Sequence, residues 1–405
     1  MLKWIEIDLG IITENAKIIK KALNPGVKFV AAVKANGYGH GAAETACAAI
    51  AGGADRLAVL TAEEGSALRT ALPEKYSGAE IMLLAPSLPE EADIIIKNRL
   101  IPCADSLEFL AELDEAAKKH YEIFKTDNLL LKTDKEKKRN NDIFLNKDNE
   151  PFKADKAVSE QYPFTAETDM GMGRWGVPPE SLTDFLRKAC ALRNIRLAGI
   201  GTHLGYKPPQ NMTDAEEKLR IFAALAKAAA AICGHEIEAA AANSSVFCDL
   251  AGSQFGAVRI GNLLYGIYPT DIYKKKRQGP PLPGLRRPWQ FFAKIISIKN
   301  IKKGEKLGYN CEFTAPKDMR IAAIPAGYSD GLTMEPMEYK IRLVSGFRYW
   351  GIINGKKAYF IGKPGISHTL LDVSDIPEAA IGTPVSLHIR RTSANILIPR
   401  KYINQ

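Results

Sequence analysis

Short hydrophobic runs alternate with longer amphipathic stretches through the first two thirds of the chain. This pattern is typical of parallel strands joined by crossover helices. Residues 105–118 and 214–233 are the clearest expected helices. The expected strands are residues 27–34, 56–61, 80–85, 99–103, 162–168, 195–203, 236–242 and 257–260. Eight strands close a (β/α)8 barrel of the TIM type, so we predict an α/β fold of this kind. The seventh strand is the least distinct, because its residues also favour a helix.

The pattern changes twice along the chain. Residues 118–156 are rich in charged residues with only scattered hydrophobic ones, which predicts a solvent-exposed insertion in the barrel. After the Pro- and Gly-rich residues 279–284, the helical pattern gives way to short alternating segments. These segments are residues 290–298, 319–325, 341–346 and 384–390. We therefore predict two domains, a barrel over residues 1–280 and a mainly-β domain over residues 281–405.

Composition indicates a soluble enzyme. Acidic residues within residues 1–8 argue against a signal peptide, and no hydrophobic run could span a bilayer, so we expect the cytoplasm and no membrane partner. The net charge of +9 is spread out, and its densest clusters, residues 274–277 and 286–287, lack interleaved aromatic residues, so we expect no nucleic-acid partner. The six cysteines contain no C-x-x-C pair, which predicts free thiols without a disulfide framework or metal site.

The most informative residue is Lys34, which stands where the first barrel strand breaks into a glycine-rich turn. An isolated lysine at a strand end usually only extends its ammonium to water. In the mouth of a barrel, however, partial burial can lower its pKa and make the amine a nucleophile. Residues 33–41 (VKANGYGHG) resemble the pyridoxal-phosphate lysine motif of alanine racemases, which are fold-type III pyridoxal-phosphate enzymes. The resemblance implies that Lys34 carries pyridoxal 5'-phosphate and that Tyr38 reaches its phosphate.

Further matches follow the ends of later strands. Residues 167–176 (ETDMGMGRWG) resemble the racemase segment whose arginine contacts cofactor and substrate carboxylate, a role that passes to Arg174. Glu167 stands where many members have a carbamylated lysine, and we expect its carboxylate to hold Arg174. His203 matches a histidine packed on the cofactor ring, although a lone histidine is more often structural. Arg259 matches the arginine facing the pyridine nitrogen, which it leaves unprotonated. The other cofactor-binding positions are Asn243, Ser244, Gly261 and Asn262, the last three forming a phosphate cradle with Tyr38.

Racemisation needs a proton donor on each face of the substrate, so a second base must accompany Lys34. Residues 304–310 (GEKLGYN) resemble the family motif with the catalytic tyrosine, which assigns Tyr309. In the family this tyrosine serves the neighbouring subunit, so the resemblance implies a homodimer with shared active sites. Tyr328 and Ile366 complete the expected substrate contacts, and without the motif a tyrosine in a β domain would be read as a core or surface residue.

Some positions depart from the family. Ile396 replaces a phosphate-binding tyrosine, Ala240 replaces a histidine that supports the pyridine-facing arginine, and residues 362–368 lack a methionine–aspartate pair. We therefore predict a pyridoxal-phosphate-dependent alanine racemase that supplies D-alanine for peptidoglycan. The alternatives are a racemase of another or broader range, serine first, and a cofactor-binding protein without turnover. A decarboxylase or aldolase on the same barrel fits less well, because Arg259 shortens the lifetime of a carbanion.

Overall fold

The computed structural model describes residues 1–121, 161–269, 282–308, 311–332, 340–343, 346–389 and 394–404. It divides into two compact units. The barrel unit comprises residues 12–35 and 46–286, and the β unit comprises residues 1–11, 36–45 and 287–405. Most of the predicted charged insertion lies outside the described residues. Its described part, residues 118–121, is the end of a helix over residues 107–121.

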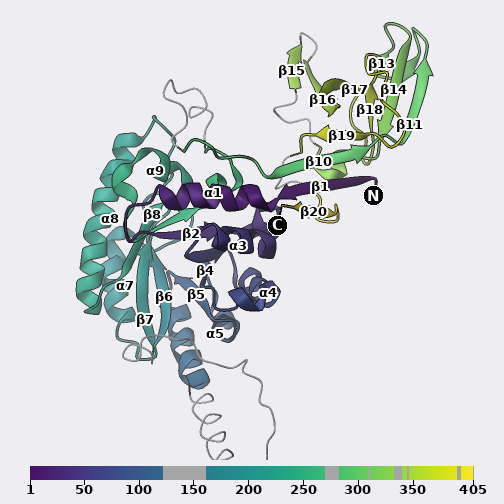
Figure 1. Ribbon diagram of the computed structural model, residues 1–405. Helices are drawn as coiled ribbons and strands as arrows, with labels where there is room; N and C mark the ends of the chain where they lie inside the picture. The colour runs from purple at the N-terminus through teal and green to yellow at the C-terminus, as the bar shows by residue number, and fades with distance from the viewer. Residues whose placement is uncertain are drawn as a thin grey trace, which may run out of the picture. The chain divides into compact units, whose positions relative to one another are not determined.

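The barrel unit is a closed parallel barrel, as the sequence predicted (Figure 1). Every predicted strand is present, including the seventh. The strands are β2 (Lys28–Ala32), β3 (Arg56–Val59), β4 (Ile81–Pro86), β5 (Leu100–Ala104), β6 (Tyr162–Glu167), β7 (Ile195–Gly201), β8 (Glu238–Ala242) and β9 (Ala257–Ile260). Closure comes from β9, which pairs in parallel with β2.

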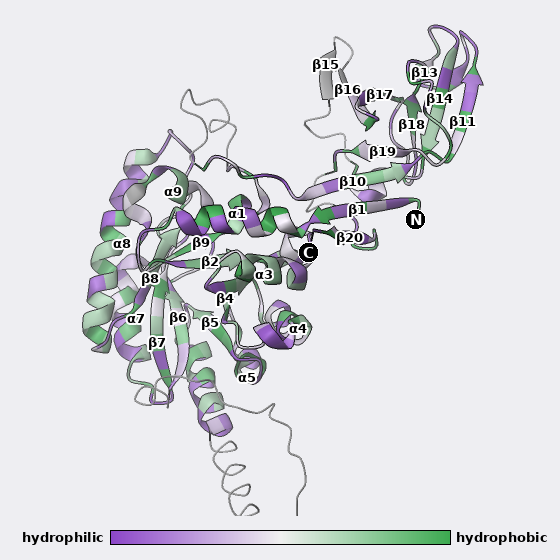
Figure 2. Ribbon diagram, in the orientation of Figure 1, coloured by the Kyte–Doolittle hydropathy of each residue, from purple (hydrophilic) through white to green (hydrophobic). Residues whose placement is uncertain are grey.

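Amphipathic helices connect these strands, and in Figure 2 helix α1 is banded in hydrophobic and hydrophilic colours. Its buried side chains Ile12, Ala16 and Ile19 recur at the spacing of one helix face. The helices are α1 (Leu9–Lys21), α3 (Ala42–Ala51), α4 (Ala62–Ala71), α5 (Ala92–Lys97), the helix over residues 107–121, α7 (Leu182–Ala189), α8 (Met212–Cys233) and α9 (Ser244–Asp249). Both helices expected from the sequence pattern are confirmed by the helix over residues 107–121 and by α8.

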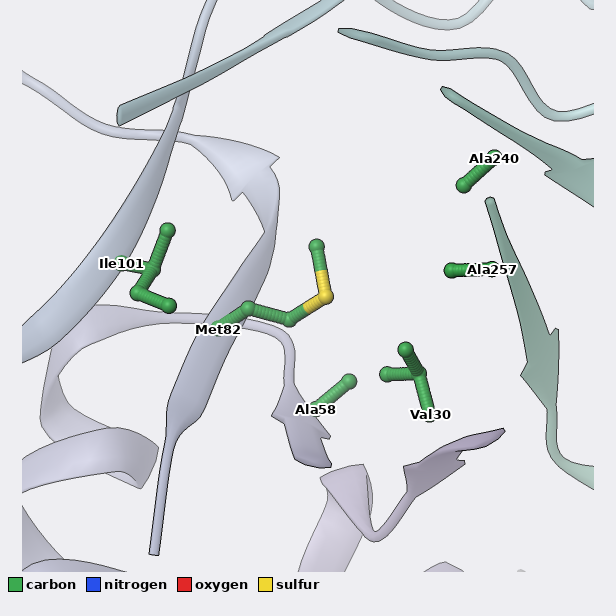
Figure 3. Packing of buried hydrophobic residues seen from close by; sticks show 6 residues of the cluster. All are labelled: Val30, Ala58, Met82, Ile101, Ala240 and Ala257. Atoms are coloured by element: carbon green, nitrogen blue, oxygen red, sulfur yellow. The ribbon is translucent and has the colours of Figure 1, made fainter. Parts of the chain in front are cut away.

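Side chains fill the barrel in layers, as is typical of this fold. The middle layer is apolar, and Figure 3 shows its members pointing into the interior: Val30, Ala58, Met82, Ile101, Ala240 and Ala257. Because side chains alternate along a strand, residues two positions away share this inward face. The layer below therefore contains Arg56, which bonds Glu80 and Glu238. The layer above contains Arg259, two residues beyond Ala257, so the chemistry lies at the carboxyl ends of the strands.

The β unit is built on one large sheet, which confirms a C-terminal mainly-β region. Strand β1 (Lys3–Asp8) joins it by pairing antiparallel with β10 and parallel with β20, a partnership the sequence pattern did not reveal. The other strands of the large sheet are β10 (Trp289–Lys294), β11 (Ser297–Ile301), β14 (Met319–Ile324), β15 (Lys340–Leu343), β16 (Gly346–Ile353), β17 (Lys356–Ile361), β18 (Thr369–Asp372), β19 (Pro384–Leu387) and β20 (Arg400–Ile403). Strands β12 (Lys306–Leu307) and β13 (Phe313–Thr314) form a separate two-stranded sheet. The segment expected at 290–298 is two strands, β10 and the start of β11.

The six cysteines are free thiols. Two of them, Cys190 after α7 and Cys233 at the end of α8, bring their sulfur atoms within 2.7 Å of each other. Among the described helices, none is both long and hydrophobic enough to cross a membrane.

Candidate active site

Lys34 leaves the barrel where the backbone takes an unusual turn. It begins the short helix α2 (Lys34–Tyr38), in which Ala35, Asn36, Gly37 and Tyr38 all have φ between 51° and 61°. Left-handed residues other than glycine cost about 1–2 kcal/mol each, so a run of them requires support from its surroundings. The backbone N–H of Ala35 donates to Glu64 at 2.8 Å. Strain maintained directly after a strand-end lysine is typical of a functional site.

The charge state of Lys34 suits a nucleophile. Its pKa lies below the ordinary lysine value, first because the amine is partly buried and then because Arg174 and Arg259 are near. Glu64 opposes this shift without cancelling it. No described residue accepts a hydrogen bond from its Nζ atom. A larger fraction of the amine is therefore neutral, with a free lone pair, than in an exposed lysine.

The sequence predicted that Glu167 holds Arg174. In the structure Glu167 pairs with Arg259 instead. Its Oε2 and Oε1 atoms accept hydrogen bonds from Nη1 and Nη2 of Arg259 at 2.7 and 3.1 Å. Nη2 also donates to the carbonyl of Thr202 at 2.5 Å. Burial disfavours the charge of Arg259, yet Glu167 raises its pKa above the ordinary value. The guanidinium is thus a fixed cation and can only donate hydrogen bonds.

Arg174 is positioned by its own loop. Asp169 Oδ1 accepts hydrogen bonds from the backbone N–H groups of Gly171, Met172 and Gly173 at 2.8–3.1 Å, which shapes the turn before Arg174. The guanidinium carbon of Arg174 lies 3.6 Å from the centre of the Trp175 ring. Such stacking restrains the arginine while leaving its N–H groups available. Trp175 was not among the predicted site residues, although an aromatic residue beside the predicted arginine was a usable signal.

His203 follows β7 and remains neutral. Its pKa is lowered to about 3, first by burial and then by the positive charges of Arg259, Arg174 and Lys34. The Nδ2 atom of Asn243 lies 3.4 Å from His203 Nε2 and donates to the carbonyl of Leu204 at 2.9 Å. A neutral imidazole can lie against an aromatic ring without adding to the positive charge of this site.

This shift predicts a dependence of stability on pH. The unfolded histidine binds a proton below about pH 6.5 while the folded one resists it down to about pH 3, so acidification favours unfolding. We expect His203 to remove up to about 1.4 kcal/mol of unfolding free energy per pH unit in this window. Urea unfolding of the wild-type protein and of His203→Gln at pH 4 to 7 measures the effect. As the pH falls, the unfolding free energy of the wild type should decrease relative to that of His203→Gln. If the two unfolding free energies depend on pH in parallel, the assignment is contradicted.

The loops after β8 and β9 meet, as expected of an anion cradle. The backbone N–H of Gly261 donates to the Ser244 hydroxyl at 3.3 Å, and Ser244 is buried. Asn262 begins a short 3-10 helix that ends at Tyr265, whose hydroxyl donates to the carbonyl of Ala32 at 3.0 Å. The Oδ1 atom of Asn243 caps α9 by accepting from the N–H groups of Ser245 and Val246. The structure therefore brings Ser244, Gly261 and Asn262 together.

Other predicted residues belong to the β unit. Tyr328 and Ile366 lie on adjoining segments, since Tyr328 N–H donates to Gly365 O at 3.0 Å and Ser329 N–H to Ile366 O at 2.9 Å. Both side chains are more than half exposed. Tyr38 ends α2. Tyr309 lies outside the described residues.

The C-terminal strand supports the glycine-rich segment that follows Lys34, a role we did not foresee. Tyr402 forms a hydrogen bond with Glu44, and burial together with Glu44 raises its pKa to about 12. Arg400 Nε donates to the carbonyl of Gly39 at 3.4 Å. Ile396, which replaces the expected tyrosine, is exposed. No local sequence pattern connects residues 39–44 with the strand about 360 positions later.

A strand-end lysine with a lowered pKa and two nearby arginines at the mouth of a parallel barrel are typical of an enzyme of the β/α-barrel class. Comparison with known proteins identifies the family. Residues 7–140 and 149–269 match the family profile "Alanine racemase, N-terminal domain", and residues 289–398 match "Alanine racemase, C-terminal domain". The chain belongs to the alanine racemase family.

Individual relatives agree with this assignment. The chain is 29% identical over 391 residues to an alanine racemase of Desulfovibrio desulfuricans, covering 95% of this chain and 88% of the relative. It is 26% identical to one of Methanococcus maripaludis, over 95% and 88% of the two chains. Among solved structures, the Clostridium difficile alanine racemase superposes with a TM-score of 0.77 at 21% identity, covering 100% of this chain and 97% of the other. The Bacillus anthracis enzyme with bound L-Ala-P gives a TM-score of 0.75 at 23% identity, over 100% and 96%.

Proposed function

We propose that this protein is a pyridoxal-phosphate-dependent racemase that interconverts L- and D-alanine and supplies D-alanine for peptidoglycan. The observation that carries the proposal is Lys34, a partly buried amine with a lowered pKa at the carboxyl end of a barrel strand. Arg174 and Arg259 stand close enough to contribute to that shift. The family membership of the whole chain supports the same reaction.

The described residues fit pyridoxal 5'-phosphate. Ser244 and Gly261 lie side by side after β8 and β9, since the N–H of Gly261 donates to the Ser244 hydroxyl, and loops at this end of a barrel commonly bind phosphate. Nε–H of Arg259 has no acceptor within the described part of the chain, so it can serve the pyridine nitrogen. His203 is neutral and can lie against the ring, and Asn243 keeps the adjoining loop in place. When bound, the cofactor supplies electron withdrawal from the α-carbon, which makes the α-proton acidic.

Substrate binding and proton transfer are carried out by different residues of the chain. Arg174 binds the substrate carboxylate and fixes which bond faces each base. The amine of Lys34 removes or delivers the α-proton on one face, and the phenol of Tyr309 does so on the other. We place Tyr309, together with the entrance residues Tyr328 and Ile366, in the site of a neighbouring subunit. Activity then requires a homodimer, which acts in the cytoplasm.

The test is proton exchange in deuterated water. Cofactor-loaded protein is incubated with L-alanine while the configuration and the α-deuterium content are followed together. We expect D-alanine that contains deuterium, and a loss of about 10²–10⁴ in its rate with Tyr309→Phe because one base is missing. Tyr76→Phe, distant from the barrel mouth, is the matched control and should behave as the wild type. Deuterium incorporation with retained L-configuration would show that Lys34 works alone.

The same assay distinguishes the alternatives. L-Serine and L-lysine, offered in place of L-alanine, show whether the enzyme has a broader substrate range. The exposed Ile396, where a pocket-lining tyrosine is expected, is the observation that favours such a range. Cofactor absorbance without any α-proton exchange would indicate a binding protein without turnover.

A further inference from the structure

Glu167 and Arg259 form a buried ion pair in which the orientation of the arginine is fixed. Both side chains are buried, that of Glu167 with 4% and that of Arg259 with 7% of its surface exposed. Glu167 occupies both terminal nitrogens of Arg259, and the Thr202 carbonyl takes a further hydrogen of Nη2. The plane of the guanidinium is therefore fixed by three hydrogen bonds. Two of its five N–H groups, Nε–H and the second N–H of Nη1, are left without an acceptor among the residues that the structure describes.

The backbone is shaped to admit this pair. A Cβ atom added to Gly201 would lie 2.5 Å from Glu167 Oε2 and 2.9 Å from Arg259 Nη1, so only glycine leaves the two charges room to meet. Gly201 pairs with Ala240 in the barrel, and Ala240 belongs to the apolar middle layer. Because residue 240 is an alanine, its side chain cannot orient Arg259. Glu167 is the carboxylate that contacts Arg259 in the described structure.

We propose that Glu167 is the positioning residue for Arg259, and that it determines which N–H of the arginine reaches the pyridine nitrogen of the cofactor. The inference rests on the proposed function. Glu167 also balances one positive charge in a site that contains Lys34 and Arg174. Without that carboxylate, Arg259 would be a buried and unpaired cation, free to turn toward other acceptors.

The competing assignment is that Glu167 serves Arg174. Arg174 has its own support, because Asp169 shapes its loop and Trp175 stacks on its guanidinium. The two assignments predict different kinetic effects. Loss of support for Arg259 changes the environment of the cofactor ring and lowers kcat. Loss of support for Arg174 weakens binding of the substrate carboxylate and raises KM.

The experiment compares Glu167→Gln with Asp169→Asn, an equally small change in the loop of Arg174. The readouts are the pH titration of the absorbance of bound cofactor, the dissociation constant of the cofactor, and kcat and KM for L-alanine. For Glu167→Gln we expect a shifted titration, weaker cofactor binding and a kcat lowered by up to about 100-fold, as misplacement of a catalytic group produces. KM should stay within about threefold, whereas Asp169→Asn should mainly raise KM.

The outcomes separate the two proposals. If the wild type racemises alanine but Glu167→Gln has an unchanged spectrum and kcat, or raises KM alone, the role of Glu167 is overturned. A wild type that binds no cofactor or exchanges no α-proton overturns the proposed function instead. If Glu167→Gln does not fold, Glu167→Asp keeps the charge but shortens its reach. It should then show the same spectral and kcat changes, and wild-type behaviour of that variant would count against the proposal.

Discussion

Replacing Lys34 by alanine is expected to remove covalent attachment of pyridoxal phosphate and to lower racemase activity by about 10⁴-fold or more. If the proposed function holds, the variant loses both the amine that would bind the cofactor and one of the two bases. Its fold should persist, because the side chain forms no hydrogen bond with a described residue. Gel filtration followed by absorbance measures the retained cofactor, and mass spectrometry after reduction identifies the labelled lysine in the wild type.

Lys28→Ala is the matched control for this experiment. Lys28 lies at the amino end of the same strand, half exposed and paired with Glu238 at 3.1 Å, so its loss should leave cofactor and activity intact. A small primary amine added to Lys34→Ala should restore part of the activity by replacing the missing base. Label on a lysine other than Lys34, or full activity of Lys34→Ala, would contradict the assignment.

The barrel was predictable because its signal is local and repeated. Each strand is a short hydrophobic run followed by an amphipathic stretch, and even β8, rich in helix-forming residues, could be placed by counting. Lys34, His203 and Arg259 were assigned by their resemblance to racemase motifs, and each stands at or just after the carboxyl end of a barrel strand, where this fold places its chemistry. Their roles in the site stay a prediction.

The partner of Glu167 could not be predicted in this way. Glu167 stands where many members of the family have a carbamylated lysine, and this resemblance favoured Arg174 over Arg259, which lies 92 positions from Glu167. The choice depends on distances across the barrel and on the space left by Gly201, which no periodic pattern encodes. The same reason hid the pairing of β1 with β10 and the contact of Tyr402 with Glu44, since both join distant parts of the chain.

The largest effect on stability is expected at the opposite end of the barrel, from Arg56→Met. Arg56 donates to Glu80 at 2.8 Å and to Glu238 at 2.6 Å, and its side chain is 8% exposed. Burial works against its charge, but the two carboxylates together raise its pKa above the ordinary value. Removing the guanidinium leaves Glu80 and Glu238 without their shared partner, and among the described residues the ion pair of Glu238 with Lys28 at 3.1 Å is then the one that remains. We expect a loss of about 3 kcal/mol in unfolding free energy, measured by urea denaturation of the cofactor-free protein.

Two comparisons show whether this loss comes from the unpaired carboxylates. Lys17→Met removes an ion pair with Glu14 in which both side chains are more than half exposed, and it should leave the urea midpoint almost unchanged. Arg56→Met combined with Glu238→Gln should be more stable than Arg56→Met alone, because the second substitution removes one uncompensated charge. If the double variant is instead less stable, Arg56 acts mainly by filling the lower layer of the barrel. Equal stability of Arg56→Met and the wild type would show that the network contributes nothing, and that the apolar middle layer alone holds the strands together.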